Sequence, residues 1–167
     1  WRGKCSRWQV ASGKSQVAGS RWQVAGGKWV EGNVFKNFEE WLIQVPDSLK
    51  NDPLWEFVAY RHALFLADLA WFDTDRIIKE PKAKGIAWQL IDSAGSIAAN
   101  IEEGYGRGFG KDYSRFLRIA IGSARETRGW YYRSRHVLEG QVLEHRLHLI
   151  DQIIASLVIV SKQQRNA

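Results

Sequence analysis

The stretch that decides the fold is AKGIAWQLIDSAGSIAANIEEG, residues 83–104. Its apolar residues recur at intervals of three and four, the spacing that places side chains on one face of an α-helix. These residues are Ala83, Ala87, Leu90, Ala94, Ile97, Ala98 and Ile101. The pattern therefore predicts an amphipathic helix that ends near Gly104.

Amphipathic patterns also precede this stretch. A short one covers residues 35–44 and ends before Pro46. The pair Asp52-Pro53 supplies an N-cap followed by proline at the first helical position, so we expect a helix to open there and to run until Pro81. Its apolar face is expected to comprise Leu54, Phe57, Val58, Leu64, Phe65, Ala67, Leu69 and Phe72.

Two further helices are expected after residue 104. The run GYGRGFG, Gly104–Gly110, is interpreted as a helix C-cap and a turn that needs positive φ. A third helix is predicted to start near Asp112, with apolar residues Tyr113, Phe116, Leu117, Ala120, Ala124, Tyr131 and Leu138. After Gly140, a fourth carries Leu143, Leu147, Ile150, Ile154 and Leu157.

The fold class follows from these patterns. Four amphipathic helices, short links and no convincing strand predict an all-α, antiparallel, up-and-down four-helix bundle with a short N-terminal helix. We expect this domain to span residues 34–167. The chain has 167 residues, a length that suits one domain with a sizeable core.

Composition excludes several classes of protein. The lone Cys5 rules out a disulfide framework and a cysteine zinc site, and it suits a reducing cytoplasm. No apolar run approaches the ~18–20 residues of a membrane span, so we expect no membrane association and no signal peptide.

The first 33 residues form a repeat tail. SRWQVASGK (residues 6–14) returns as SRWQVAGGK (residues 20–28), and this composition predicts a disordered low-complexity arm. A second hypothesis is a translated tandem DNA repeat upstream of the true start, with Val34 read from a GTG codon, since the sequence holds no Met.

The tail also accounts for most of the positive charge. Residues 1–34 carry six Lys or Arg and one acid, which is +5 of the total of +6. The basic isoelectric point of the whole chain therefore says little about whether the bundle itself binds nucleic acid.

Metal, cofactor and catalytic sites are not indicated. None of His62, His136, His145 and His148 follows a Glu by three residues, so the Glu-x-x-His pairs of di-iron bundles are missing. The glycine run follows no predicted strand and makes no nucleotide-binding fingerprint. We therefore expect neither enzymatic activity nor a cofactor.

A polar strip borders the apolar face of the predicted helix at residues 83–104. Its members step by three and four residues and are Gln89, Asp92, Ser96, Asn100 and Glu103. A polar network between helices or subunits is our main interpretation, with ligand contact as an alternative. Catalysis by Ser96 is disfavoured because no His lies near it in the sequence.

A basic stripe marks the third predicted helix. Lys111, Arg115, Arg118, Arg125 and Arg133 fall within a sector of about 80° opposite the apolar face, with Gly122 in the same stripe. This spacing can follow phosphates, and Tyr105, Phe109 and Trp130 lie near enough for stacking on bases. The alternative is a solvated face balanced by acids on a neighbouring helix.

Two motifs resemble a known family. SIAANIEEGYGR (Ser96–Arg107) and FLRIAIGSARE (Phe116–Glu126) are similar to the bacterial four helix bundle proteins, also called 23S rRNA intervening-sequence proteins. The positions that match the family pattern are Ser96, Ile97, Asn100, Ile101, Glu103, Gly104, Arg107, Phe116, Leu117, Ala120, Gly122, Ser123 and Glu126. Glu102 departs from it, because the family usually has Ala there.

The resemblance implies a homopentamer without enzymatic activity. Some members are encoded inside insertions of the large ribosomal RNA gene. A related branch serves diversity-generating retroelements, where a basic pentamer binds nucleic acid and a reverse transcriptase. The family's molecular role is otherwise mostly unassigned.

We expect a pentameric accessory protein that binds RNA or DNA through Arg107, Lys111, Arg115, Arg118 and Arg125. The motif residues Ser96, Asn100, Glu103, Gly104, Gly122, Ser123 and Glu126 are expected to serve the fold or the subunit interface. The alternative is a structural or protein-interaction scaffold, such as a reverse-transcriptase accessory subunit, without nucleic-acid affinity of its own.

Overall fold

The structure is a computed structural model that describes residues 24–25, 28–29, 35 and 37–166. The chain divides into two units, Trp1–Asn33 and Val34–Ala167. In the first unit, the described residues form the short strands β1 (Val24–Ala25) and β2 (Lys28–Trp29), which pair antiparallel. The sequence pattern does not predict this pairing. The predicted disorder of the remaining tail residues, and a start at Val34, concern positions outside the described ones.

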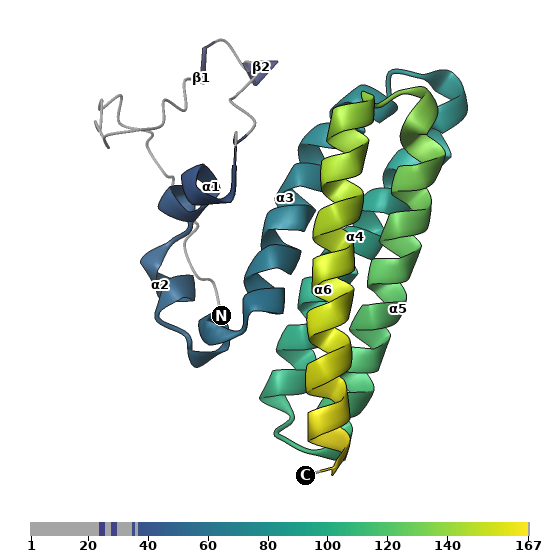
Figure 1. Cartoon of the computed structure of the whole chain (residues 1–167). Helices are drawn as coiled ribbons and strands as arrows, with labels where there is room; N and C mark the ends of the chain where they lie inside the picture. Colours follow the sequence, from purple (N-terminus) through teal and green to yellow (C-terminus); the bar gives the residue numbers. More distant parts are fainter. Residues whose placement is uncertain (1–23, 26–27, 30–34, 36, 167) are drawn as a thin grey trace, which may run out of the picture. The chain divides into compact units, whose positions relative to one another are not determined.

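Four long helices form the bundle of the second unit (Figure 1). They are α3 (Val58–Ile77), α4 (Lys84–Gly106), α5 (Lys111–Arg133) and α6 (Gly140–Asn166). Helix α3 packs against α4 and α6, and α5 packs against the same two helices, so α3 and α5 lie diagonally opposite. The predicted antiparallel four-helix bundle is confirmed.

The core lies where the apolar stripes of the four helices meet. The large apolar side chains with less than 2% exposure come from all four helices: Leu66, Leu69, Ile77, Leu90, Ile97, Ile101, Leu117, Tyr131, Ile150, Ile153 and Leu157. Burial of apolar surface on this scale is the main source of stability in a helical bundle.

A strap of short helices precedes the bundle. It consists of α1 (Phe38–Gln44), α2 (Asp47–Lys50) and the 3₁₀ helix η1 (Pro53–Glu56), and we call it the N-terminal strap. Helix α1 starts at Asn37, whose side-chain oxygen accepts a hydrogen bond from the Glu40 N–H at 2.9 Å. The Phe38 ring lies 5.4 Å from that of Phe65, so the strap packs on α3.

The predicted opening of the first long helix is wrong by one turn. Asp52 does cap, accepting from the Leu54 N–H at 2.7 Å, but it opens η1 and not α3. Phe57 then adopts an extended conformation with φ −78° and ψ 106°, and α3 begins at Val58. Val58 was expected on the apolar face, yet its side chain is 46% exposed. Helix α3 begins at this residue, so its buried face does not continue the face expected for a helix that starts at Asp52.

The links between the later helices also differ from the expected ones. Helix α4 continues through Gly106, so Gly104 lies inside the helix and does not cap it. Positive φ occurs only later, at Gly108 (100°) and Gly110 (88°) among the described residues. Helix α5 ends at Arg133, and the buried Leu138 follows the 3₁₀ helix η3 (Ser134–His136) instead of belonging to α5. A 3₁₀ helix, η2 (Pro81–Ala83), links α3 to α4.

Candidate nucleic-acid interface

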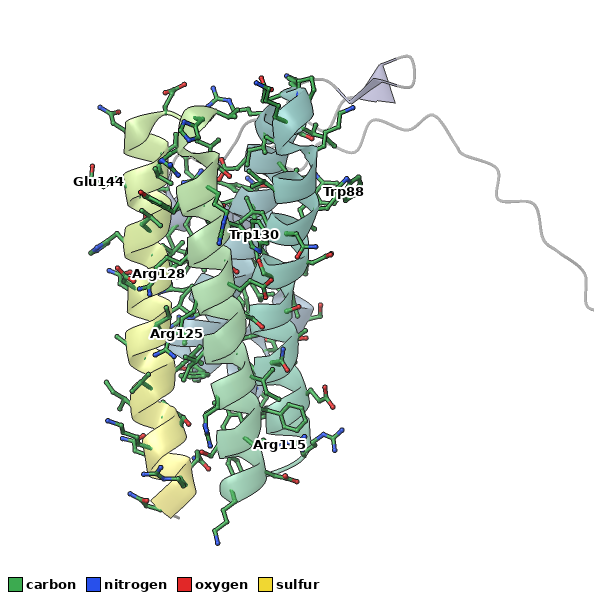
Figure 2. All side chains as sticks on the ribbon, turned by 90° about the vertical axis from the view of Figure 1, so that its right-hand side faces the viewer. Trp88, Arg115, Arg125, Arg128, Trp130 and Glu144 are labelled. Atoms are coloured by element: carbon green, nitrogen blue, oxygen red, sulfur yellow. The ribbon has the colours of Figure 1, made fainter. Side chains whose placement is uncertain are left out.

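The outward face of α5 carries a row of exposed cations. We call Lys111, Arg115, Arg118 and Arg125 the basic row; all four side chains are exposed. Their spacing of four, three and seven residues keeps them on one side of the helix, opposite its buried residues. Figure 2 shows α5 in front, with Arg115 near one end of the helix and Arg125 closer to its middle.

None of these cations is neutralised within the described part of the chain, where no carboxylate oxygen lies within 4.0 Å of them. Other arginines nearby are paired. Arg107 Nη2 lies 2.6 Å from Glu103 Oε1, and Arg128 Nη1 lies 2.8 Å from Asp151 Oδ1 on α6. Arg107, which we expected to contact nucleic acid, is thus held by α4. The charge available on this face comes from the basic row.

Aromatic rings accompany the cations. The guanidinium carbon of Arg107 lies 4.8 Å from the centre of the Phe116 ring, and that of Arg115 lies 5.6 Å from it. Arg133 stacks in the same way on Trp130 at 4.6 Å. A guanidinium held against a ring keeps its charge and loses less conformational entropy when it binds a phosphate.

The predicted polar strip lies on α4, and among the described residues its side chains make only local hydrogen bonds. Ser96 Oγ donates to the Asp92 carbonyl at 2.7 Å, and Asn100 Nδ2 donates to the Ser96 carbonyl at 2.7 Å. Gln89, Asp92 and Glu103 are exposed, while Ser96 and Asn100 are half-buried. Of the strip, only Glu103 forms an ion pair among the described residues, with Arg107. Within the part of one chain that the structure describes, the polar network expected between helices is therefore not formed.

Some residues of the family motif are buried between helices, and others are exposed on the surface. Gly104 is buried where α4 crosses α5, and a Cβ atom there would lie 2.6 Å from Phe116 Cβ. Gly122 lies exposed with open space around it. The carbonyl of the half-buried Ser123 accepts from Thr127 Oγ1 at 2.8 Å, and Glu126 Oε1 accepts from Trp130 Nε1 at 3.2 Å.

The structure also contains a buried polar cluster that the sequence analysis does not single out. Arg146 of α6 donates from Nε to Asp73 Oδ2 at 2.8 Å and from Nη2 to Oδ1 at 3.2 Å. The Tyr131 hydroxyl of α5 donates to the same Oδ2 at 2.9 Å, and its burial raises its pKa. Asp73 lies within the apolar stripe of α3, four residues from Leu69 and from Ile77. A carboxylate at such a position indicates a buried polar contact, and this was the sign of the cluster that the sequence offered.

The described residues contain neither a metal-binding cluster nor a membrane-spanning helix. Nowhere in that part of the chain do three His, Cys, Asp or Glu side chains gather in a way that could hold a metal ion. Its helices include none with the length and apolar character needed to cross a bilayer.

Fold and motifs together define a small bundle with an outward basic helix and a tightly packed α4–α5 pair. Residues 56–158 match the family described as 23S rRNA-intervening sequence protein. The chain belongs to this family, which confirms the resemblance of its two motifs.

A solved structure shares the fold. It is a protein of unknown function from the S23 ribosomal protein family of Bacteroides thetaiotaomicron, 24% identical, with a TM-score of 0.58. The match covers 63% of this chain and 99% of that one, so the solved protein corresponds to a part of this chain. The search of curated proteins finds no match.

Proposed function

We propose that this member of the 23S rRNA-intervening sequence family is a non-enzymatic, homopentameric accessory protein of the cytoplasm that binds RNA or DNA. The observation that carries the proposal is the basic row, whose four exposed cations have no carboxylate partner among the described residues. Exposed cations along one helix face are suited to a phosphate backbone, because each neutralised phosphate releases a condensed counterion.

A ring of subunits strengthens the argument from charge. The bundle region, residues 35–167, carries 18 Lys or Arg against 17 acids, so a single copy attracts a polyanion weakly. Several basic rows in one assembly would bind the same strand and multiply a weak contact through avidity. The half-buried Ser96 and Asn100 on α4 leave polar groups available for the contacts between subunits.

The proposal of a non-enzymatic role rests on the local bonding of the one serine considered as a nucleophile. Ser96 Oγ donates to the Asp92 carbonyl, and no histidine lies within hydrogen-bonding distance of it among the described residues. Nucleophilic catalysis by serine requires an adjacent base. A screen of the purified protein for hydrolase activity on nucleic acids tests this point, and a null result is expected.

The decisive experiment reverses two charges of the basic row. Arg115→Glu with Arg118→Glu should weaken binding to all RNA and DNA sequences and flatten the dependence of affinity on salt. The matched control is Lys79→Glu with Lys82→Glu, two exposed lysines near η2, which should bind like the parent protein. Mobility shifts at two salt concentrations measure both variants.

The tail requires its own control, because residues 1–34 add a net charge of +5 and can bind polyanions without the bundle. The same comparison is therefore repeated with a chain that starts at Val34, after circular dichroism has confirmed that it is helical. If this trimmed protein binds neither RNA nor DNA at low salt, or if the double reversal binds as well as its parent, the proposed function is wrong.

The exposed tryptophans favour a protein-interaction scaffold as a second candidate function. Trp71 on α3 is 62% exposed and Trp88 on α4 is 61% exposed, and exposed aromatic side chains are common at protein interfaces. In this case the partner would be a protein such as a reverse transcriptase. A reverse-transcriptase gene beside this one, together with an absence of nucleic-acid binding, would favour the scaffold.

A further inference from the structure

Two exposed aromatic side chains lie near the two ends of the basic row. Phe109 precedes α5 and is 73% exposed, and Tyr132 near the C-terminal end of α5 is 57% exposed. The helix that separates them is about 30–35 Å long at 1.5 Å per residue. A surface that contains both cations and uncovered rings offers a strand two different kinds of contact.

Tyr132 continues the line of the basic row. Arg118, Arg125 and Tyr132 follow one another at intervals of seven residues, two helical turns, so they share one side of α5. The guanidinium carbon of Arg135 lies 4.4 Å from the centre of the Tyr132 ring, and Arg135 Nη1 donates to the Tyr132 carbonyl at 3.1 Å. Arg135 thereby fixes the ring from one side and adds a further positive charge beside it.

Phe109 is held outward by the backbone. It lies between Gly108 and Gly110, whose φ angles of 100° and 88° are readily adopted only by glycine. The rings of Tyr105 and Tyr113 lie nearly perpendicular to it, at 5.9 Å and 6.4 Å between centres, and support it. The turn thus presents an apolar ring to solvent on a base of two other rings.

Trp130, by contrast, is less accessible than Tyr132. Each ring has an arginine over one face, but the Trp130 side chain is half-buried and its Nε1 donates to Glu126 at 3.2 Å, so its remaining surface is less free for a base. The rings best placed for a ligand are therefore Phe109 and Tyr132.

We infer that the basic row binds single-stranded nucleic acid, with phosphates along Lys111, Arg115, Arg118 and Arg125 and unpaired bases stacked on Tyr132 and Phe109. The inference rests on the proposed function and adds the class of ligand. In a duplex each base is stacked between its neighbours and cannot reach a protein ring, whereas every unpaired base offers a free face. A site for duplex alone would have no use for exposed rings beside its cations.

The test compares ligands that all carry phosphate charge and that differ in whether unpaired bases are available for stacking. Fluorescence anisotropy with the full chain measures binding to a mixed-sequence RNA of about 20 nucleotides, longer than the usual single-strand site. The other probes are the DNA strand of the same sequence, the corresponding RNA duplex, and inorganic polyphosphate, which carries charge without bases.

Alanine variants then separate stacking from charge. Tyr132→Ala and Phe109→Ala should each lower affinity for both single strands about fivefold or more, and by the same factor for RNA and DNA. Neither change should alter binding to the duplex or to polyphosphate. Tyr132→Phe should retain the parent affinity, because stacking requires the ring and not the hydroxyl. The control Ile43→Ala removes an exposed apolar side chain (75% exposed) from α1, away from the basic row, and should have no effect.

Three outcomes distinguish the two ideas. Binding of duplex as tightly as single strands, with no effect of Tyr132→Ala and Phe109→Ala, would overturn this inference and leave the proposed function standing. Equal losses on single strands and on polyphosphate would also overturn it, since Tyr132 would then act only by holding Arg135. Failure of the parent protein to bind any nucleic-acid probe would instead remove the proposed function itself.

Discussion

Gly104 sets the distance between α4 and α5. Its missing side chain allows Phe116 Cβ to come within 2.6 Å of the point that a Cβ atom would occupy. Because Phe116 Cβ is attached directly to the backbone of α5, it cannot rotate away, and only a movement of the whole helix could make room. The motif glycine is thus explained by packing between two helices.

Substitution of Gly104 should therefore be costly, and a second glycine of α4 offers the control. Gly104→Ala should reduce the free energy of unfolding by about 1–3 kcal/mol, as overpacking does elsewhere. Gly95→Ala, in the same helix with nothing within 4 Å of its Cβ, should raise it by about 0.5–1 kcal/mol. Urea denaturation measures both changes, and equal effects at the two positions would contradict the packing argument.

Asp73 is the residue on which three helices converge. Its carboxylate accepts from Arg146 of α6 and from Tyr131 of α5 while its own backbone belongs to α3. Its side chain and that of Arg146 are both buried. A buried charge that has lost one of its partners is far more costly than an exposed one, because water cannot replace the missing bond.

Asp73→Asn should accordingly lower the free energy of unfolding by about 3–5 kcal/mol, because Arg146 would keep a buried and uncompensated charge. Asp151→Asn is the matched control, since it breaks the exposed ion pair with Arg128 and should cost less than about 1 kcal/mol. Chemical denaturation of the two variants side by side provides the comparison. A loss for Asp73→Asn no larger than that of the control would show that the buried pair contributes little.

The N-terminal strap lies almost entirely outside the residues that match the family. The family match begins at residue 56, so α1, α2 and almost all of η1 lie before it. The strap is attached through aromatic contacts: Phe38 meets His62 and Phe65 of α3 at 5.1 and 5.4 Å between ring centres. Trp41 is buried and donates from Nε1 to Asp68 Oδ2 at 2.6 Å.

Attachment of the strap should depend on pH through His62. Burial, together with the neighbouring Arg61, lowers the pKa of His62 below its ordinary value of 6.5. The folded protein therefore holds this proton less tightly than the unfolded chain does. The contribution of the uncharged His62 to the free energy of unfolding is fully present above about pH 6.5. It is lost as the pH falls from that value towards the lowered pKa of the folded state. Asp68 acts in the opposite sense, because burial raises its pKa.

We expect His62→Gln to flatten the decline in the free energy of unfolding between pH 7 and about pH 5. Glutamine does not titrate in this range. The variant therefore lacks the proton uptake by which acid destabilises the parent protein. Denaturation curves of the parent and the variant at several pH values give the two slopes. Parallel slopes would show that His62 does not couple the strap to pH.

The helices could be predicted from sequence wherever an apolar stripe and its end signals agreed. Helix α5 starts at Lys111, one residue from the predicted start, because glycines precede it and Tyr113 and Phe116 set its phase. The start of α3 could not be located in this way, because Asp52-Pro53 is an equally good signal for a 3₁₀ helix as for an α-helix. The glycine run was equally ambiguous, since Gly104 is required by packing and Gly110 by its φ angle.

The candidate site was only partly predictable. The exposed positions of the basic row follow from helix periodicity, but Arg107 forms a pair with Glu103 that its sequence spacing permits without requiring it. The pairing of Asp73 with Arg146 spans 73 residues and cannot be found without knowing which faces of α3 and α6 meet.

At the scale of the whole molecule, the outer side of α4 is where we expect subunits to meet. Asn100 is half-buried, and among the described residues its amide nitrogen bonds only to the Ser96 carbonyl of its own helix. Two exposed tryptophans, Trp71 and Trp88, lie on the neighbouring α3 and on α4 itself. An assembly would bury these groups and supply partners for the amide.

Light scattering should therefore give the full chain about five times the mass of one copy. Asn100→Leu should shift this mass towards smaller species, because polar partners on the neighbouring subunit would lose a hydrogen bond worth ~1–3 kcal/mol if buried. The control Gln163→Leu changes an exposed amide on α6 and should keep the parent mass. A parent protein that stays monomeric at all concentrations would remove the pentamer.

The diagonal arrangement of the bundle has a consequence for the order in which it forms. Helices α3, α4, α5 and α6 each contact their neighbour in sequence, and these local contacts require only short loops to close. The contact between α3 and α6 brings together the first and the last helix of the bundle, and the Asp73–Arg146 pair belongs to this contact. We expect this pair to form after the rate-limiting barrier to folding. Asp73→Asn should then speed unfolding and leave refolding nearly unchanged in stopped-flow experiments. The buried pair would thus set the lifetime of the folded bundle by slowing its unfolding.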